Sequence, residues 1–203
     1  MPTTPLVTHL LYLHGFRSSP QSAKAQAMAA AVQRHRPSVQ WWCPQLPPSP
    51  AAAMRLLLDG LTDWPLAAKG SQLAIVGSSL GGFYAAVLAR RLGCLTVLIN
   101  PAAHPARDLA RHLGTQTQWH DAAQTFFFEP CFIDELQALG SGRIAAPGHN
   151  TLALIAQDDE VLDWREMAAF CADAQVRLIQ GSDHALSDFD AHLPTILDFL
   201  RLA

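Results

Sequence analysis

The fold of this 203-residue chain is decided by the stretch Ile75-Val76-Gly77-Ser78-Ser79-Leu80-Gly81-Gly82. A short apolar run of strand type covers residues 73–76, and an alanine-rich run of helical type covers residues 83–92. Two arginines and Gly93 end the helical run, and glycine is common just past the end of a helix. Between the two runs, Ser79 is the central residue of the pattern Gly-x-Ser-x-Gly, which joins a strand to a helix through a sharp turn.

The geometry of such a turn predicts chemistry at Ser79. A sharp turn forces this residue to a positive φ, and side chains two positions to either side would collide as strand and helix approach each other. Gly77 and Gly81 avoid that collision. The helix that follows directs its N–H groups, with their partial positive charge, toward the Ser79 hydroxyl. We therefore interpret Ser79 as a nucleophile and Ser78 as structural. The alternative is a glycine-rich connection without chemistry.

Composition and charge narrow the class of protein. A length of 203 residues with 50% hydrophobic residues fits one domain, residues 1–203, with a sizeable core. A net charge of −3 predicts no basic surface for nucleic acid or anionic lipid. The four cysteines form no Cys-x-x-Cys pair and are interpreted as reduced thiols of a cytoplasmic protein. We expect no signal peptide and no membrane span, because the start of the chain is not basic and the apolar runs are short.

Short apolar runs alternate with helical patterns, which predicts an α/β fold with a mostly parallel sheet flanked by helices. Strands are expected at 6–13, 39–43, 73–76, 95–99, 151–156 and 176–179. Helices are expected at 20–35, 51–64, 83–92, 164–174 and 194–202. Ser19 is a candidate cap for the first helix, with Pro20 as its first residue.

The segment 104–150 breaks this alternation. It has no clear strand pattern and contains Trp119 and the consecutive residues Phe126, Phe127 and Phe128. An insertion at the carboxyl edge of a parallel sheet lies where ligands bind. We interpret the segment as a lid whose phenylalanines contact the substrate. The alternative is a surface excursion whose aromatic side chains complete the core.

A serine hydroxyl becomes a good nucleophile only when a base removes its proton, and that base needs a third group to orient its ring. In hydrolases of this architecture the chain order is serine, acid, histidine, with the last two on loops after later strands. Of the nine histidines, His184 lies directly after the strand expected at 176–179. The others precede Ser79, fall in the insertion, come before the last two strands or adjoin the final helix. His184 is the predicted base.

The acid is expected on the loop after the strand at 151–156, where an acidic run begins at Asp158. Asp159 is preferred, because an apolar residue two positions later would anchor the loop. Asp158 and Asp163 are the other candidates for the acid. Their alternative interpretation is as solvated loop carboxylates or helix caps. The other place for an acid, after the preceding strand, holds the neutral Asn100, which favours the later loop.

The tetrahedral intermediate of acyl transfer carries a negative oxygen that needs two hydrogen-bond donors, each worth roughly 3 kcal/mol. The backbone N–H of Leu80 is one candidate. The other is expected from the loop after the first strand, where Gly15 permits a close approach, and the N–H of Phe16 is preferred. The ring of His14 is interpreted as a support for that loop. No spacing of metal ligands is present, so no metal or organic cofactor is expected.

Five segments of the chain resemble the YqiA-like esterases, a family of small α/β-hydrolases. They are His14-Gly15-Phe16-x-Ser18-Ser19-Pro20-x-Ser22-x-Lys24, Gly77-Ser78-Ser79-Leu80-Gly81-Gly82, Asn100-Pro101-Ala102, Asp159-Glu160-Val161-Leu162-Asp163 and Asp183-His184-Ala185. The resemblance implies a compact α/β-hydrolase fold and esterase activity on short-chain or aryl esters and acyl-CoA thioesters. It also implies that Ser79, Asp159 and His184 form a triad. The chain departs from the family at Asp158 and Ser182, and the insertion matches poorly.

The leading hypothesis is a cytoplasmic serine carboxylester hydrolase that acts on small esters and also on thioesters. A second hypothesis keeps the same residues for amide hydrolysis or perhydrolysis. A third is a non-catalytic module that binds acyl groups or other small molecules on the same fold. The serine, acid and histidine in the expected order count against the third, because binding alone needs none of them. Neither nucleic acid nor a membrane is an expected partner.

Overall fold

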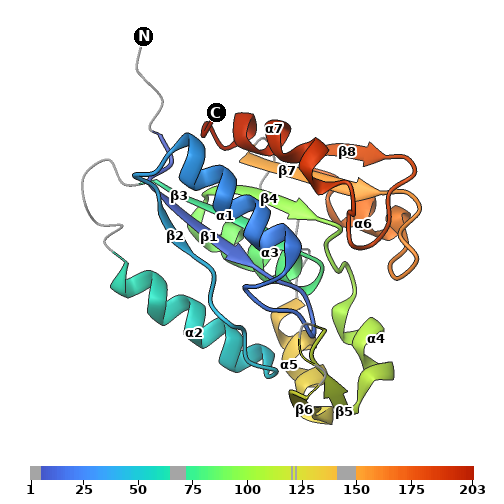
Figure 1. The fold of residues 1–203 in the computed structure, drawn as a ribbon. Coiled ribbons are helices and arrows are strands. Elements are labelled where there is room, and N and C mark those ends of the chain that lie inside the picture. Colours follow the sequence, from blue (N-terminus) through green and yellow to red (C-terminus); the bar gives the residue numbers. More distant parts are fainter. Residues whose placement is uncertain (1–5, 65–71, 120, 122, 141–149) are drawn as a thin grey trace.

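The computed structural model describes residues 6–64, 72–119, 121, 123–140 and 150–203. Its centre is a six-stranded sheet with the order β2-β1-β3-β4-β7-β8, and every neighbouring pair is parallel (Figure 1). This confirms the predicted α/β class. The strands are β1 (His9–Leu13), β2 (Gln40–Trp42), β3 (Leu73–Ser78), β4 (Leu95–Ile99), β7 (Thr151–Ala156) and β8 (Gln175–Ile179).

Helices cover both faces of this sheet. One face packs against α1 (Ala23–His35) and α7 (Phe189–Phe199), and the other against α2 (Pro50–Asp63), α3 (Leu80–Leu92) and α6 (Trp164–Phe170). Successive strand residues alternate between the two cores: Ile75 packs with α2 and α3, and Val76 packs with α1 and α7. Because both faces of the four central strands are buried, these strands read as nearly continuous apolar runs. Within the described residues, no helix has the apolar length that a bilayer crossing requires.

Several boundaries differ from the expected ones. The first helix begins at Ala23 with Ser22 at its N-cap, so the expected cap at Ser19 is wrong. The Ser19 hydroxyl accepts a hydrogen bond from the Gln21 N–H in a turn before the helix. The last helix begins well before the expected position and carries Pro194 in its interior, where one helical hydrogen bond is missing.

The described part of segment 104–150 lies at the bottom of Figure 1, and its buried residues Phe128 and Leu136 share one core with α2 and α3. It contains α4 (Pro105–Leu109), a short 3₁₀ helix η1 (Ala110–His112), β5 (Gly114–Thr117), β6 (Thr125–Phe128) and α5 (Pro130–Gly140). The expectation that this segment has no strand is wrong, because β5 and β6 pair as an antiparallel hairpin. Four residues in each strand are too few for a clear alternation in the sequence. Residues 120, 122 and 141–149 of the predicted insertion lie outside the described residues.

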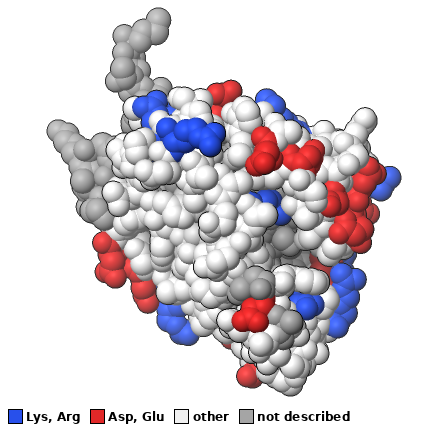
Figure 2. Space-filling view, viewed as in Figure 1, with Lys and Arg blue, Asp and Glu red and all other residues white. Residues whose placement is uncertain are grey.

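Figure 2 shows where charge lies on one face of the molecule. The Lys and Arg side chains visible there lie in several small groups, most of them with acidic groups nearby, and a wide uncharged area covers the middle of the view. This distribution agrees with the low charged content of the chain, 15%.

Candidate active site

Ser79 lies in the turn between β3 and α3 with φ 55° and ψ −120°, a backbone conformation that is rare for residues other than glycine. Its N–H donates to the Ile99 carbonyl at 2.9 Å, and its carbonyl accepts from the Ala102 N–H at 3.0 Å. The turn is therefore attached to the chain at the end of the neighbouring strand, β4. These contacts hold the strained residue in place.

The glycines around Ser79 permit a close approach of three chain segments. A Cβ atom on Gly77 would lie 2.3 Å from the Gly81 carbonyl oxygen, and one on Gly81 would lie 2.1 Å from the Leu13 carbonyl oxygen. The predicted collision between strand and helix is thus confirmed. A Cβ atom on Gly15 would lie 3.3 Å from the Ser79 Cβ, so the loop after β1 rests directly against the serine.

Three polar side chains from different loops form one hydrogen-bonded row. The His184 Nε2 lies 3.2 Å from the Ser79 Oγ, and the His184 Nδ1 lies 2.7 Å from the Asp159 Oδ2. The Asp159 side chain has no exposed surface, and that of His184 is 22% exposed. Because a carboxylate accepts hydrogen bonds, the arrangement assigns the ring proton to Nδ1. The lone pair of Nε2 then faces the serine hydroxyl.

Backbone N–H groups orient the carboxylate of Asp159. Its Oδ1 accepts from the N–H groups of Val161 and Leu162, both at 2.8 Å, which leaves Oδ2 for His184. We expected the apolar side chains of Val161 and Leu162 to anchor this loop. This is wrong for Val161, which is 43% exposed, whereas Leu162 packs against the core. Hydrogen bonds to the backbone add to this anchor.

The two alternative carboxylates lie in other environments. Asp158 is exposed, and its Oδ2 accepts from the Gly181 N–H at 2.9 Å. Asp163 is the N-cap of α6 and accepts from the Arg165 N–H at 2.8 Å, as its reading as a helix cap predicts. Of the three aspartates, Asp159 is the one that the structure brings to the histidine ring.

The candidate oxyanion donors lie on two sides of Ser79. Leu80 is the first residue of α3, where N–H groups have no partner within the helix. Phe16 follows Gly15 on the loop that rests against the serine. The buried ring of His14 supports this loop, because its Nε2 accepts from the Leu46 N–H at 3.1 Å and its Nδ1 donates to the Gly15 carbonyl at 3.0 Å. The expected supporting role of His14 agrees with these contacts.

A small cavity of about 30 Å³ lies beside this turn. Phe16 and Leu80 line it, together with Phe126 from β6 and Tyr84 from α3. None of the three polar residues of the row lines it, but its lining residues Gly15 and Leu80 lie directly beside Ser79.

The three consecutive phenylalanines of β6 have different surroundings. Phe126 lines the small cavity and contacts the ring of Phe16 edge-on, with the ring centroids 5.8 Å apart. Phe128 is fully buried against Phe16 and Phe132, whereas Phe127 is 59% exposed. Successive residues of a strand point to opposite faces, so one run cannot place all three in one pocket. Of the three residues predicted to contact the substrate, Phe126 is the one that lines this cavity.

Arg17 connects the hairpin to the loop beside Ser79, a connection that the sequence did not indicate. Its Nε donates to the Thr117 carbonyl at 2.5 Å, and its guanidinium carbon lies 4.1 Å from the ring centroid of Trp119. The backbone N–H of Trp119 in turn donates to the Arg17 carbonyl at 2.8 Å. The hairpin therefore packs directly against the segment that carries Phe16.

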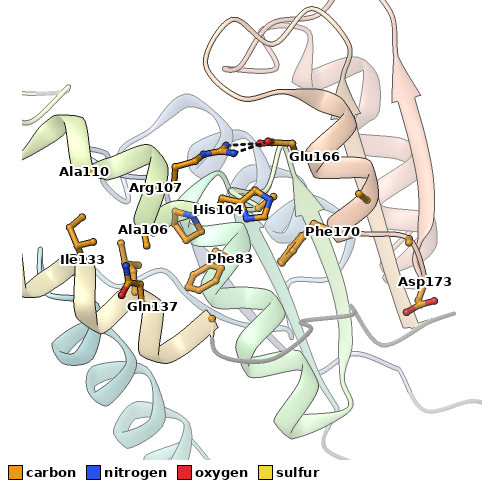
Figure 3. A pocket seen from close by; sticks show the side chains of 16 residues that line it. Phe83, His104, Ala106, Arg107, Ala110, Ile133, Gln137, Glu166, Phe170 and Asp173 are labelled. Atoms are coloured by element: carbon orange, nitrogen blue, oxygen red, sulfur yellow. Dashed lines mark hydrogen bonds and ion pairs between the residues drawn. The ribbon is translucent and has the colours of Figure 1, made fainter.

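A second, larger cavity of about 860 Å³ lies between α4, α5, α6 and the start of α3 (Figure 3). Its walls include Phe83 and Phe170, and an ion pair between Arg107 of α4 and Glu166 of α6 crosses above it. The two hydrogen bonds of this pair measure 2.7 and 2.5 Å, and they hold the pKa of Glu166 below its ordinary value. None of the three polar residues of the row lines this cavity.

Solved structures of several other proteins share this architecture. A structure from LipS and LipT, two metagenome-derived lipolytic enzymes, matches with a TM-score of 0.72 and 17% identity over 99% of this chain and 96% of the other. Mouse alpha/beta hydrolase domain-containing protein 10 matches with 0.69 and 16%, over 98% and 92%. Est1E from Butyrivibrio proteoclasticus, with ferulic acid bound, matches with 0.67 and 14%, over 97% and 87%.

At these identities the likeness shows the fold, which is that of the α/β-hydrolases. The sequence itself adds a closer relationship. Residues 9–201, nearly the whole chain, match the uncharacterised protein family UPF0227. The chain therefore belongs to this family, the YqiA-like family that its motifs resemble.

Proposed function

We propose that this protein is a serine hydrolase that cleaves carboxylic esters through an acyl-enzyme. Ser79 is the nucleophile, His184 the general base and Asp159 the group that orients the ring. The observation that carries the proposal is the hydrogen-bonded row, with 2.7 Å between carboxylate and ring and 3.2 Å between ring and hydroxyl. Both distances lie within or close to the range that proton transfer requires.

In the first half of the reaction, the Ser79 Oγ attacks the carbonyl carbon of the ester while the His184 Nε2 takes the hydroxyl proton. The negative oxygen that develops receives hydrogen bonds from the N–H groups of Leu80 and Phe16. Asp159 stays ionised and stabilises the protonated ring. When the tetrahedral intermediate collapses, the bond to the alcohol oxygen breaks, and His184 gives its proton to the leaving alcohol.

The second half repeats these steps with water. His184 takes a proton from the water, whose oxygen attacks the acyl carbon, and the same two N–H groups bind the new oxyanion. Collapse breaks the bond between the acyl carbon and Ser79 Oγ, which takes the proton back from His184. The carboxylic acid is released and the enzyme is restored, so the cycle needs no other reactant.

Two observations support esters as the substrate class. The similar structures include lipolytic enzymes and Est1E with ferulic acid bound. The small cavity next to Phe16 and Leu80 favours a short acyl group. Thioester cleavage is implied by the family resemblance alone, and it requires the same steps with a thiol as the leaving group.

A fluorophosphonate probe tests the proposal, because only a serine activated by a base reacts with it. We expect the native protein to be labelled at Ser79, and Ser79→Ala to be folded and unlabelled. Ser78→Ala is the matched control, because Ser78 is buried next to the nucleophile and should keep its label. A native protein that is folded but unlabelled would instead support a binding module.

A panel of esters, thioesters and amides with graded acyl chains then separates the enzymatic alternatives. We expect short esters to be cleaved fastest and amides slowest. Rapid cleavage of amides, or transfer of the acyl group to hydrogen peroxide in preference to water, would contradict the esterase assignment but leave Ser79 as the nucleophile.

A further inference from the structure

The loop that carries His184, residues 181–188 and here called the His184 loop, is held by side chains that the reaction above does not use. Three consecutive carbonyl groups of this loop accept hydrogen bonds from Asn100 or Lys24. We propose that Asn100 and Lys24 are positioning residues that fix the backbone of this loop and thereby set the approach of the His184 ring to Ser79. The inference rests on the proposed function.

Asn100 uses its whole side chain for this purpose. It lies directly after β4 and is fully buried. Its amide nitrogen donates to the carbonyls of Asp183, at 3.1 Å, and His184, at 3.0 Å. Its amide oxygen accepts from the Ala156 N–H at the end of β7, at 2.8 Å. The amide thus spans the ends of two strands and the loop, and no other side chain of its size offers two donors and one acceptor in this arrangement.

The position of Asn100 connects the nucleophile with the base. The residue before it, Ile99, accepts the hydrogen bond from the Ser79 N–H, and Ala102 donates to the Ser79 carbonyl. The same short segment therefore holds Ser79 through its backbone and His184 through the Asn100 side chain. The φ of 41° at Asn100 is unusual for a residue other than glycine, and the surrounding hydrogen bonds hold it there.

Lys24 holds the next residue of the loop. It projects from α1, and its Nζ donates to the carbonyl of Ala185. The side chain is half-buried, which lowers the pKa of its ammonium group, while the negative charges of Asp183 and Asp159 oppose that lowering. Its contact with the Ala185 carbonyl attaches the loop to α1.

Carboxylates hold the N–H groups of the same loop. Glu160 accepts from the His184 N–H at 3.0 Å, and Asp158 accepts from the Gly181 N–H at 2.9 Å. Residue 184 is thus held at its N–H by Glu160 and at its carbonyl by Asn100. Glu160 and Asp158 are exposed whereas Asn100 is buried, so water can replace the carboxylates more readily than the amide.

The test replaces the amide by a group of the same shape that cannot donate. Asn100→Asp turns carboxylate oxygens toward two carbonyl oxygens and should displace the loop. We expect kcat and the rate of fluorophosphonate labelling to fall between about tenfold and about a hundredfold, with KM within about twofold, because a small shift of the base slows proton transfer more than binding. Thr96→Val is the control: Thr96 is fully buried on the same strand and donates to the Cys94 carbonyl at 3.2 Å. It should lower the melting temperature and label at the native rate.

A second pair of variants keeps the inference testable if Asn100→Asp does not fold. Lys24→Met removes the donor, and we expect labelling to slow by about threefold to about tenfold; Lys24→Arg keeps a cationic donor and should restore most of the rate. Native labelling rates in both Asn100→Asp and Lys24→Met would overturn the positioning role alone. A folded native protein without any labelling would overturn the proposed function, and this inference with it.

Discussion

The polar side of the candidate site and its apolar side are built by different means. Ser79, Asp159 and His184 lie at the carboxyl ends of parallel strands or on the loops that follow, and backbone hydrogen bonds orient each of them. The apolar side comes from the hairpin β5–β6, which is outside the six-stranded sheet and packs through aromatic rings. Hydrogen bonds specify direction and distance, whereas apolar contacts specify mainly volume. Changes on the polar side should therefore alter rate, and changes on the apolar side should alter stability and substrate size.

The largest expected effect is on the polar side, at Asp159. Asp159→Asn keeps the shape but removes the charge that orients and stabilises the protonated ring, so we expect kcat for ester hydrolysis to fall by up to about 10⁴. Asp158→Asn should lower kcat by less than about tenfold, because its amide oxygen can still accept from the Gly181 N–H. The opposite ranking in steady-state assays would assign the acid to Asp158.

The next effect lies on the apolar side, at the buried end of β6. Phe128 is fully buried, and Phe128→Ala should lower the free energy of unfolding by about 3–5 kcal/mol, through lost burial and the cavity that remains. Phe127→Ala, one residue away and exposed, should change it by less than about 0.5 kcal/mol. Urea unfolding of both variants checks the difference. Equal losses would mean that the alternation along β6 is wrong.

These two sides were also predictable to different degrees. Two strands, Leu95–Ile99 and Thr151–Ala156, have the predicted bounds, because burial on both faces leaves an uninterrupted apolar run that is easy to delimit. The turn at Ser79 was predictable, because its glycines are required by sterics that act within a few residues. The preference for Asp159 agrees with the geometry, but one of its causes, two backbone N–H donors, has no sequence signal.

The parts that sequence reasoning missed depend on contacts between distant residues. The hairpin strands are short, and which of three identical phenylalanines faces the cavity depends on strand register. The sequence indicates only that Asn100 is a neutral residue at the other position where the acid was possible. Its hydrogen bonds to the His184 loop join residues 83 and 84 positions apart, which only the folded chain brings together.

A third, smaller effect concerns the length of the acyl chain. We expect kcat/KM to rise a few-fold per added carbon until the small cavity is full, since burial of a methylene contributes about 0.8 kcal/mol. Phe126→Ala enlarges that cavity and should move the preferred chain to a longer acyl group, whereas Phe127→Ala should leave it unchanged. An ester series with each variant measures this. Unchanged preference in Phe126→Ala would mean that the acyl group binds elsewhere.

The smallest effect belongs to the ion pair over the larger cavity. The side chains of Arg107 and Glu166 are 57% and 35% exposed, so solvent screens the pair, and Glu166→Gln should lower the free energy of unfolding by about 0.5 kcal/mol or less at neutral pH. Arg107 lowers the pKa of Glu166 in the folded protein. The ion pair therefore stabilises the folded protein fully above the pKa that Glu166 has in the unfolded chain. This stabilisation is lost as pH falls through the lower pKa that Glu166 has in the folded protein.

Urea unfolding of the native protein and of Glu166→Gln should accordingly converge at acidic pH, with Asp173→Asn, at the edge of the same cavity, as control. Ester hydrolysis should stay at the native rate in Glu166→Gln, because none of the residues of the row lines this cavity. A fall in the rate of Glu166→Gln with unchanged stability would contradict the division between the two sides of the site. The larger cavity would then belong to the substrate site, and residues of the insertion would contribute to turnover.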